Sequence, residues 1–124
     1  MIAADTSSLV AYLSNEGGDD QTLLEASIQQ ETLRLPLVVI TELLSLPGRS
    51  ERLRPFIISL PPLEISDGYW ARAGDNRRLL LGKGLKANLP DTLIAQSCID
   101  NDVPLIARDR DYRHFAQWCG LKLA

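Results

Sequence analysis

Short apolar runs alternate along the chain with longer segments whose apolar residues recur every three or four positions. The apolar runs are interpreted as strands, at 1–5, 33–35, 63–65, 103–107 and 121–123. The amphipathic segments are interpreted as helices, at 6–13, 19–30, 36–47, 50–60, 66–81, 91–99 and 109–119. Strands that alternate with helices predict parallel pairing through right-handed crossovers. We therefore expect an α/β fold, a three-layer α/β/α sandwich around a mostly parallel sheet.

The length of 124 residues fits one domain, so we expect a single domain over 1–124. No apolar run approaches the roughly 18–20 residues that span a bilayer. The first residues, MIAADTSSLV, carry no basic side chain before their short apolar stretch, which Asp5 interrupts. That pattern is not one of a secretory signal. A cytoplasmic protein is the expectation.

Four acidic residues occupy positions where a parallel sheet forms its sites, beyond the carboxyl ends of strands or at nearby helix starts. Asp5 ends the first predicted strand, and Asp109 follows the strand at 103–107. Asp91 opens a predicted helix directly after Pro90. Glu42 interrupts an otherwise apolar helix, where a carboxylate is unfavourable unless it is paired or bound to metal.

The chemistry of these side chains limits the metals that they could bind. The sequence has one histidine and two isolated cysteines, so a histidine-rich or thiolate site is excluded. Carboxylate oxygens favour Mg²⁺ or Mn²⁺. Taken singly, each Asp is explained as a helix cap and Glu42 as a solvated helix residue. The joint pattern, with acids at two strand ends and in two helices, is what indicates a site.

Three segments resemble the motifs of PIN-domain ribonucleases, in particular the VapC-type toxins of bacterial toxin–antitoxin pairs: IAADTSSLVAYL, VVITELLSL and LPDTLIAQSCIDNDVPLIARDRDYRHF. They cover nearly the whole chain, in the order that the family has. The resemblance implies a PIN-like fold, a divalent-metal site and endoribonuclease activity on single-stranded or loop RNA. It also implies an antitoxin partner and a homodimer.

The resemblance assigns roles to individual residues. Asp5, Glu42, Asp91 and Asp109 correspond to the family's acidic quartet, and Asp111 to a further acid before an aromatic position. Hydrolysis of a phosphodiester by this chemistry needs ions that bind the phosphate and activate water. Asp5, Asp91 and Asp109 would hold Mg²⁺ or Mn²⁺. Glu42 would bind a second ion or position the attacking water. The roles of Asp109 and Asp111 could be exchanged, and Asp109 is preferred because it lies closer to the strand end.

Two hydroxyl residues and one departure from the family complete this prediction. Thr6 and Ser7 would orient Asp5 and offer hydroxyls or amides to ligands, or serve only as helix caps. The family often has Thr where this chain has Ala107, so a hydroxyl that could orient the site is absent.

Charge is distributed unevenly along the chain. The net charge is −3, with 13 Lys and Arg against 16 Asp and Glu. Residues 1–48 have seven acids and one base, a net of −6, whereas residues 49–124 have twelve bases and nine acids, a net of +3. Basic side chains supply most of the sequence-independent affinity for phosphates. Candidate RNA-binding residues are Arg108 and Arg110, which flank Asp109, and Lys86, before the Asp91 turn; Arg49 belongs to a further basic group near residue 50.

Two other functions compete with this interpretation. The first is a PIN-like module that has lost cleavage and only binds RNA or a protein, which the absent hydroxyl at Ala107 leaves open. The second is a receiver-like signalling domain with an acidic Mg²⁺ pocket. Such a domain has paired acids after its first strand and a Lys-Pro near its last, whereas here Asp5 is followed by Thr6 and no Lys-Pro occurs.

Overall fold

A three-stranded parallel sheet lies at the centre of the computed structural model, which describes residues 1–48 and 50–124 and so leaves Arg49 outside the description. β1 (Ile2–Ala4) is the middle strand, between β2 (Leu33–Arg34) and β3 (Leu105–Ile106). Ala3 is opposite Arg34 on one side and Leu105 on the other. Both faces of this sheet are covered, which explains why its strands are almost entirely apolar.

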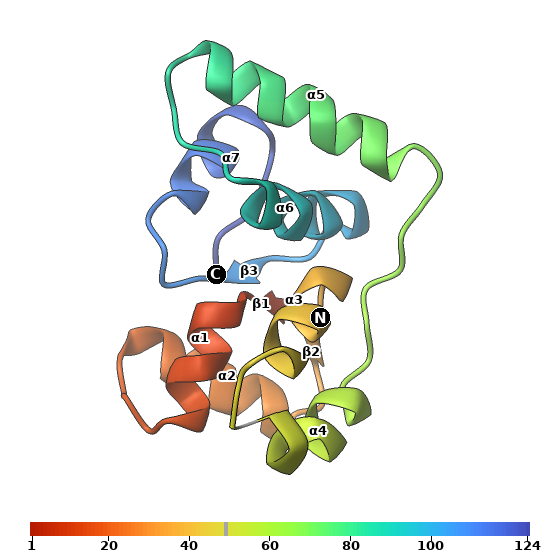
Figure 1. The fold of residues 1–124 in the computed structure, drawn as a ribbon. Coiled ribbons are helices and arrows are strands. Elements are labelled where there is room, and N and C mark those ends of the chain that lie inside the picture. Colours follow the sequence, from red (N-terminus) through yellow and green to blue (C-terminus); the bar gives the residue numbers. More distant parts are fainter. Residues whose placement is uncertain (49) are drawn as a thin grey trace.

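Seven helices surround the sheet in the described residues: α1 (Thr6–Leu13), α2 (Asp19–Gln29), α3 (Leu37–Leu44), α4 (Ser50–Ser59), α5 (Tyr69–Gly82), α6 (Leu89–Asn101) and α7 (Tyr112–Trp118). In Figure 1, α1, α2 and α4 lie below the strands and α5, α6 and α7 above them, with α3 beside the strands. Within these groups α3 packs on α4, α1 on α2, and α5 on α6, while α3 also reaches α6. The predicted α/β/α layering is confirmed.

Two helices begin beside the sheet because polar side chains cap them. The Asp5 carboxylate accepts the backbone N–H of Ser8 at 2.9 Å, so α1 starts one residue after β1 ends. The side chain of Asn88 accepts the N–H of Asp91 at 2.8 Å, and Pro90 occupies the first turn of α6. These two caps fix the backbone of Asp5 and Asp91 near one edge of the sheet.

Two predicted strands are reduced to single bridges. In the segment 63–65, the backbone of Leu63 donates to Leu35 at 2.8 Å, and the bridge itself pairs Leu35 with Pro62. Pro61 and Pro62 lack the N–H groups that a ladder needs, so the pairing stops there. The segment 121–123 forms one bridge, between Leu123 and Leu105.

Two helix starts also differ from prediction. The helix expected over 66–81 begins at Tyr69, after Gly68 in a left-handed conformation (φ 84°) that glycine adopts without strain. Ser66 precedes the helix and does not cap it with its side chain. The helix expected from 109 begins at Tyr112. No helix in the described ranges is both long and apolar enough to cross a membrane.

Candidate active site

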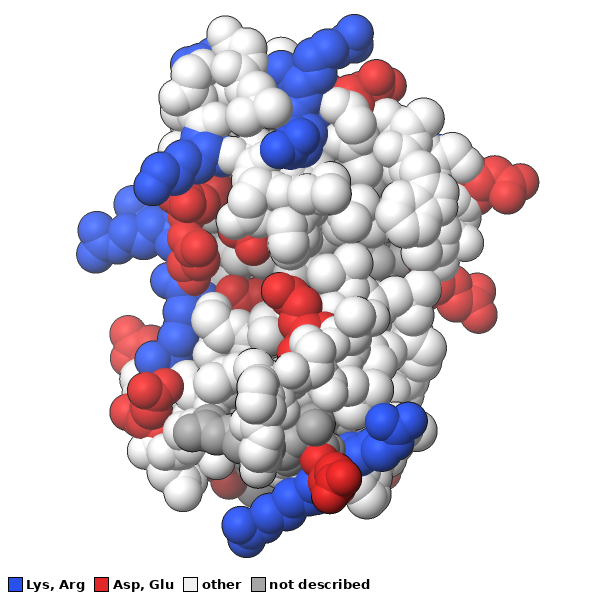
Figure 2. All heavy atoms as spheres, in the orientation of Figure 1, with Lys and Arg blue, Asp and Glu red and all other residues white. Residues whose placement is uncertain are grey.

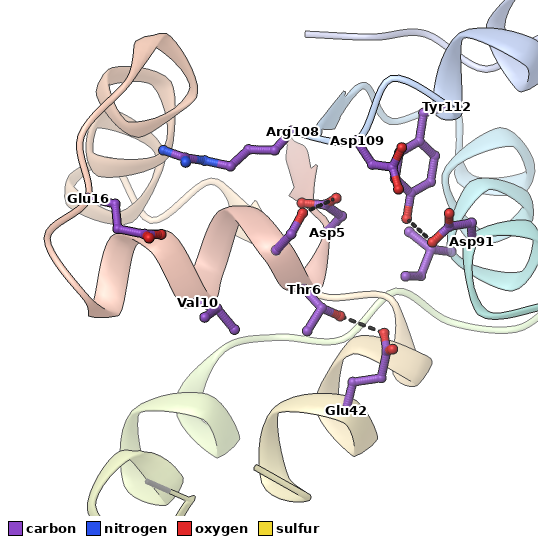
Figure 3. A pocket seen from close by; sticks show the side chains of 11 residues that line it. Asp5, Thr6, Val10, Glu16, Glu42, Asp91, Arg108, Asp109 and Tyr112 are labelled. Atoms are coloured by element: carbon purple, nitrogen blue, oxygen red, sulfur yellow. Dashed lines mark hydrogen bonds between the residues drawn. The ribbon is translucent and has the colours of Figure 1, made fainter.

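Carboxylates from five separate parts of the chain line one pocket of about 470 Å³ next to the end of β1 (Figure 3). The lining side chains come from Asp5, Thr6, Ser7, Val10, Glu16, Glu42, Asp91, Ile94, Arg108, Asp109 and Tyr112. We call this the acidic pocket, because five of these residues are acids and Arg108 is the one base. The structure therefore brings together all four members of the predicted quartet.

Asp5 is the most buried acid of the pocket, with 3% of its surface exposed. One carboxylate oxygen accepts the Ser8 N–H, and the other accepts the Ser7 hydroxyl at 2.8 Å. Burial raises the pKa of Asp5, and the nearby charge of Asp109 adds to the rise, while the two hydrogen bonds oppose it. Asp5 is thus a carboxylate fixed by hydrogen bonds that forms no ion pair within the described residues.

Asp91 is held by Tyr112, which was not among the predicted site residues. The Tyr112 hydroxyl donates to Asp91 Oδ1 at 3.1 Å, and Asn88 Nδ2 donates to Oδ2 at 3.0 Å. Burial, followed by the charges of Asp109 and Asp5, raises the pKa of Asp91. Burial and the same acidic surroundings raise the pKa of Tyr112. Tyr112 therefore stays protonated at neutral pH and remains a donor to Asp91.

The sequence offered little sign of this role for Tyr112. Its position fits an apolar helix face, and its side chain is 99% buried, as a core residue would be. The available signal was its place three residues after Asp109, since a buried Tyr hydroxyl needs a partner. Which carboxylate supplies that partner depends on how α7 packs on α6.

Glu42 reaches the acidic pocket from α3. Its carboxylate accepts the Thr6 hydroxyl at 2.6 Å, and its side chain is half-buried. Thr6 was expected to orient Asp5, and the structure places its hydroxyl on Glu42 instead. Ser7 is the hydroxyl that contacts Asp5. The first turn of α1 therefore orients two acids, one on its own segment and one on α3.

Asp109 lies in the exposed turn between β3 and α7. Its Oδ1 accepts the N–H of Asp111 at 2.8 Å, which leaves the second oxygen free of hydrogen bonds among the described residues. Asp109 lines the acidic pocket and Asp111 does not. Asp111 precedes α7 without capping it through its side chain.

The candidate RNA-binding residues occupy different surroundings. Arg108 lines the acidic pocket, but its Nε donates to Asp20 Oδ2 at 2.7 Å and its Nη2 to the Gly17 carbonyl. Burial alone would raise the pKa of Asp20, but the hydrogen bonds from Arg108 and Gln21 and the charge of Arg108 together outweigh it and lower that pKa. The charge of Arg108 is therefore directed toward α2. Arg110 lies outside the acidic pocket, in a neighbouring one, and Lys86 is exposed on the segment before α6.

The candidate ligands have the chemistry that a divalent cation needs, but their side chains are not placed closely enough to hold one. Within the described residues, no three Asp, Glu, His or Cys side chains lie close enough to hold one ion. However, all the candidate ligands are carboxylates, which Mg²⁺ and Mn²⁺ prefer. Asp5, Asp91 and Asp109 repel one another, and the one cation beside them is paired with Asp20. A divalent ion bound among these carboxylates would relieve that repulsion, and Asp109 is the one of the three that is exposed.

The surface around the pocket has a matching charge pattern. Figure 2 shows acidic side chains gathered in a hollow in the middle of this face. Basic side chains lie along its left margin, where Figure 1 places the turn between β3 and α7.

Comparisons with known proteins agree with this architecture. The sequence model described as PIN domain matches residues 2–117. The structure is similar to the crystal structure of VapBC2 from Rickettsia felis bound to a DNA fragment from their promoter, with a TM-score of 0.77. That match has 23% sequence identity and covers 100% of this chain and 98% of the other. No curated protein matches the sequence significantly. Because the PIN domain model matches nearly the whole chain, this chain belongs to the PIN domain family.

Proposed function

We propose that this protein is an endoribonuclease that depends on Mg²⁺ or Mn²⁺ and hydrolyses phosphodiesters of single-stranded or loop RNA. The observation that carries the proposal is the convergence of Asp5, Glu42, Asp91 and Asp109 in one pocket whose single cation is neutralised by Asp20. Such a pocket repels a phosphate until a divalent cation enters. An acidic pocket that needs metal before it tolerates substrate is typical of metal-assisted phosphodiester hydrolysis.

The chain's own residues divide the work of this reaction. Asp5, Asp91 and Asp109 would hold the ion, and Glu42 would hold a second ion or orient the attacking water. When bound, the metal supplies Lewis acidity toward the phosphate and lowers the pKa of coordinated water. Ser7 and Tyr112 keep the Asp5 and Asp91 carboxylates oriented, and Thr6 does the same for Glu42.

The partners follow from the family and from the structural likeness. The similar structure contains a VapB–VapC pair, so we propose that this chain is the toxin of such a pair and binds a protein antitoxin. We also propose that it forms a homodimer. The basic side chains beside the acidic pocket would contact the RNA backbone, with Arg110 and Lys86 available for this role and Arg108 once it leaves Asp20.

The decisive experiment is RNA cleavage by Asp5→Asn during titration with Mg²⁺ and Mn²⁺. The change removes one ligand charge but retains a side chain that caps α1. We expect metal-dependent cleavage by the wild-type protein and its loss in Asp5→Asn, with unchanged circular dichroism. The matched control is Asp67→Asn, which makes the same charge change at an exposed residue before α5. A folded Asp5→Asn that cleaves at the wild-type rate would overturn the assignment.

A catalytically silent PIN-like module is the second candidate, and one observation favours it. No three potential ligands are close enough to hold one ion in the described part of the chain. RNA binding without cleavage at any metal concentration would establish this alternative. The receiver-like interpretation receives no support, because the chain belongs to the PIN domain family.

A further inference from the structure

A second, smaller pocket of about 150 Å³ lies on the other side of the β3–α7 turn. Its charged lining residues are Arg108, Asp109, Arg110 and Arg113, and its remaining walls are formed by Leu105, Ala107, Leu123 and Ala124. We call it the basic pocket. Arg108 and Asp109 also line the acidic pocket, so the two pockets share one wall.

The local backbone brings two of these arginines to one side of the turn. The Arg113 N–H donates to the Arg110 carbonyl at 3.0 Å, which closes a turn at the start of α7. Both side chains line the basic pocket, Arg110 from this turn and Arg113 from the first turn of α7. The C-terminal segment forms the opposite wall, because Leu105 and Leu123 pair in a β-bridge.

Arg110 and Arg113, unlike Arg108, form no ion pair within the described residues. Arg108 pairs with Asp20 and points away toward α2 (Figure 3). Both Arg110 and Arg113 are exposed, and no ion pair joins either to a carboxylate of the described residues. Because both unpaired positive charges line one pocket, an anion bound there would interact favourably with each of them.

The chemistry of the lining selects a phosphate group. Guanidinium groups present a planar fork of donors that matches phosphate oxygens. Asp109 is the one acidic side chain of the lining, and its Oδ1 accepts the N–H of Asp111. The shared wall means that a strand with one phosphate over the acidic pocket can place a neighbouring phosphate in the basic one.

We propose that Arg110 and Arg113 form a backbone-phosphate subsite for single-stranded RNA, one step along the strand from the phosphodiester that is cut. This inference rests on the proposed ribonuclease function and adds the direction that the substrate takes. The bound strand passes over the β3–α7 turn toward the C-terminal segment. Arg113, which the sequence analysis did not select, becomes a substrate-binding residue.

The test compares Arg110→Gln/Arg113→Gln with Arg52→Gln/Arg54→Gln, an equal charge change at exposed residues of α4. Binding of a fluorescent single-stranded RNA is measured by anisotropy in Ca²⁺ as a function of salt, with circular dichroism as the check on folding. Each lost phosphate contact should reduce the slope of log affinity against log salt by about 0.7 for a single strand. We expect the slope to fall by up to about 1.4 for the first variant and to stay unchanged for the control.

A conservative double variant and a titration with inorganic phosphate make this test more specific. Arg110→Lys/Arg113→Lys should retain most of the salt slope, since lysine retains the charge, but bind RNA more weakly than the wild type because the planar fork is lost. Titration with inorganic phosphate separates a strand subsite from a site for the free ion. Binding of phosphate that requires both arginines, with RNA affinity and slope unaffected by their removal, would overturn the proposal.

The remaining outcomes separate this inference from the function on which it rests. If the wild type cleaves RNA and the Gln double variant binds RNA like the control, the ribonuclease stands and the subsite is wrong. If the wild type neither binds nor cleaves RNA, both proposals are wrong. If the double variant loses affinity only for an acidic protein partner, the pocket is a protein contact and the subsite is again wrong.

Discussion

At the scale of single residues, two of the site's carboxylates are each held at both oxygens by hydrogen bonds within the protein. Asp5 is held by Ser7 and Ser8, and Asp91 by Tyr112 and Asn88. Fixed ligands bind metal more tightly because less conformational entropy is lost on binding. Burial keeps these side chains rigid and also raises the pKa of Asp5 and Asp91.

Tyr112→Phe tests this orientation directly. The change removes the donor to Asp91 Oδ1 and retains the buried ring. Loss of a partner that orients a ligand typically weakens metal binding by roughly 10–100-fold. We expect a decrease of that order in Mn²⁺ affinity by calorimetry. Tyr12→Phe on α1 is the control, and equal affinities in the two variants would show that Tyr112 is only a core residue.

At the scale of elements, a polar network joins α5 to α6 behind the site. Arg72 donates to both oxygens of Asp100, at 3.1 and 2.7 Å, and Gln96 Nε2 donates to Asp100 Oδ1 at 2.8 Å. Asn76 completes the network by donating to Gln96 at 2.7 Å. The network fixes α5 against the helix that contains Asp91, so it supports the site without entering it.

Asp100→Asn should destabilise the protein at pH 7 and should matter less in acid. Burial alone would raise the pKa of Asp100, but the bonds from Arg72 and Gln96 outweigh it and lower that pKa. A lowered carboxyl pKa stabilises the fold above the unfolded-state pKa, and this contribution is lost as the pH falls through the folded-state pKa. Because Arg72 is partly exposed, we expect a loss of about 1–2 kcal/mol at pH 7.

Urea denaturation of wild type and Asp100→Asn between pH 7 and pH 3 measures this difference. Asp75→Asn is the matched control, because its contact with Arg78 is long, at 3.6 Å, and both side chains are exposed. A difference in unfolding free energy that stays constant over this range would show that the Asp100 charge contributes nothing.

At the scale of the whole molecule, the acidic pocket forms where the two halves of the chain meet. β1 and α3 contribute Asp5 and Glu42, while α6 and the β3–α7 turn contribute Asp91 and Asp109. The Arg108–Asp20 ion pair joins the same two halves across the pocket rim. Repulsion between the acids works against this closure, so the folded state is under electrostatic strain that a cation would relieve.

Thermal unfolding of the metal-free protein should reveal that strain. A raised carboxyl pKa destabilises the fold above the folded-state pKa, and the penalty disappears as the pH falls through it. We therefore expect Asp5→Asn to melt at a higher temperature than wild type in EDTA at pH 7. Mg²⁺, by binding only the folded state, should raise the melting temperature of wild type and not of Asp5→Asn. A wild-type melting temperature that Mg²⁺ leaves unchanged would argue against the metal site.

The order and type of the elements were predictable because they depend on local patterns. Apolar periodicity located all seven helices described, and strand ends pointed to Asp5 and Asp109. The segments 63–65 and 121–123 were predicted as strands but form only single bridges. Apolar residues alone do not show whether a neighbouring strand can pair with the whole segment. Tyr112 and Arg113 were not predicted as site residues. In sequence, Tyr112 cannot be told from an ordinary core residue, nor Arg113 from an ordinary surface residue.

Which acids could gather was predictable from local sequence patterns, because Asp5 and Asp109 follow strand ends, Asp91 opens a helix and Glu42 interrupts an apolar one. Which side chains hydrogen-bond to these acids, and which acid pairs with Arg108, depends on the tertiary structure. Thr6 meets Glu42 across 36 positions, Tyr112 meets Asp91 across 21, and Arg108 meets Asp20 across 88. Contacts over such separations depend on how crossovers and helices pack around the sheet. No local periodicity encodes that packing, since it is set by burial of the whole core.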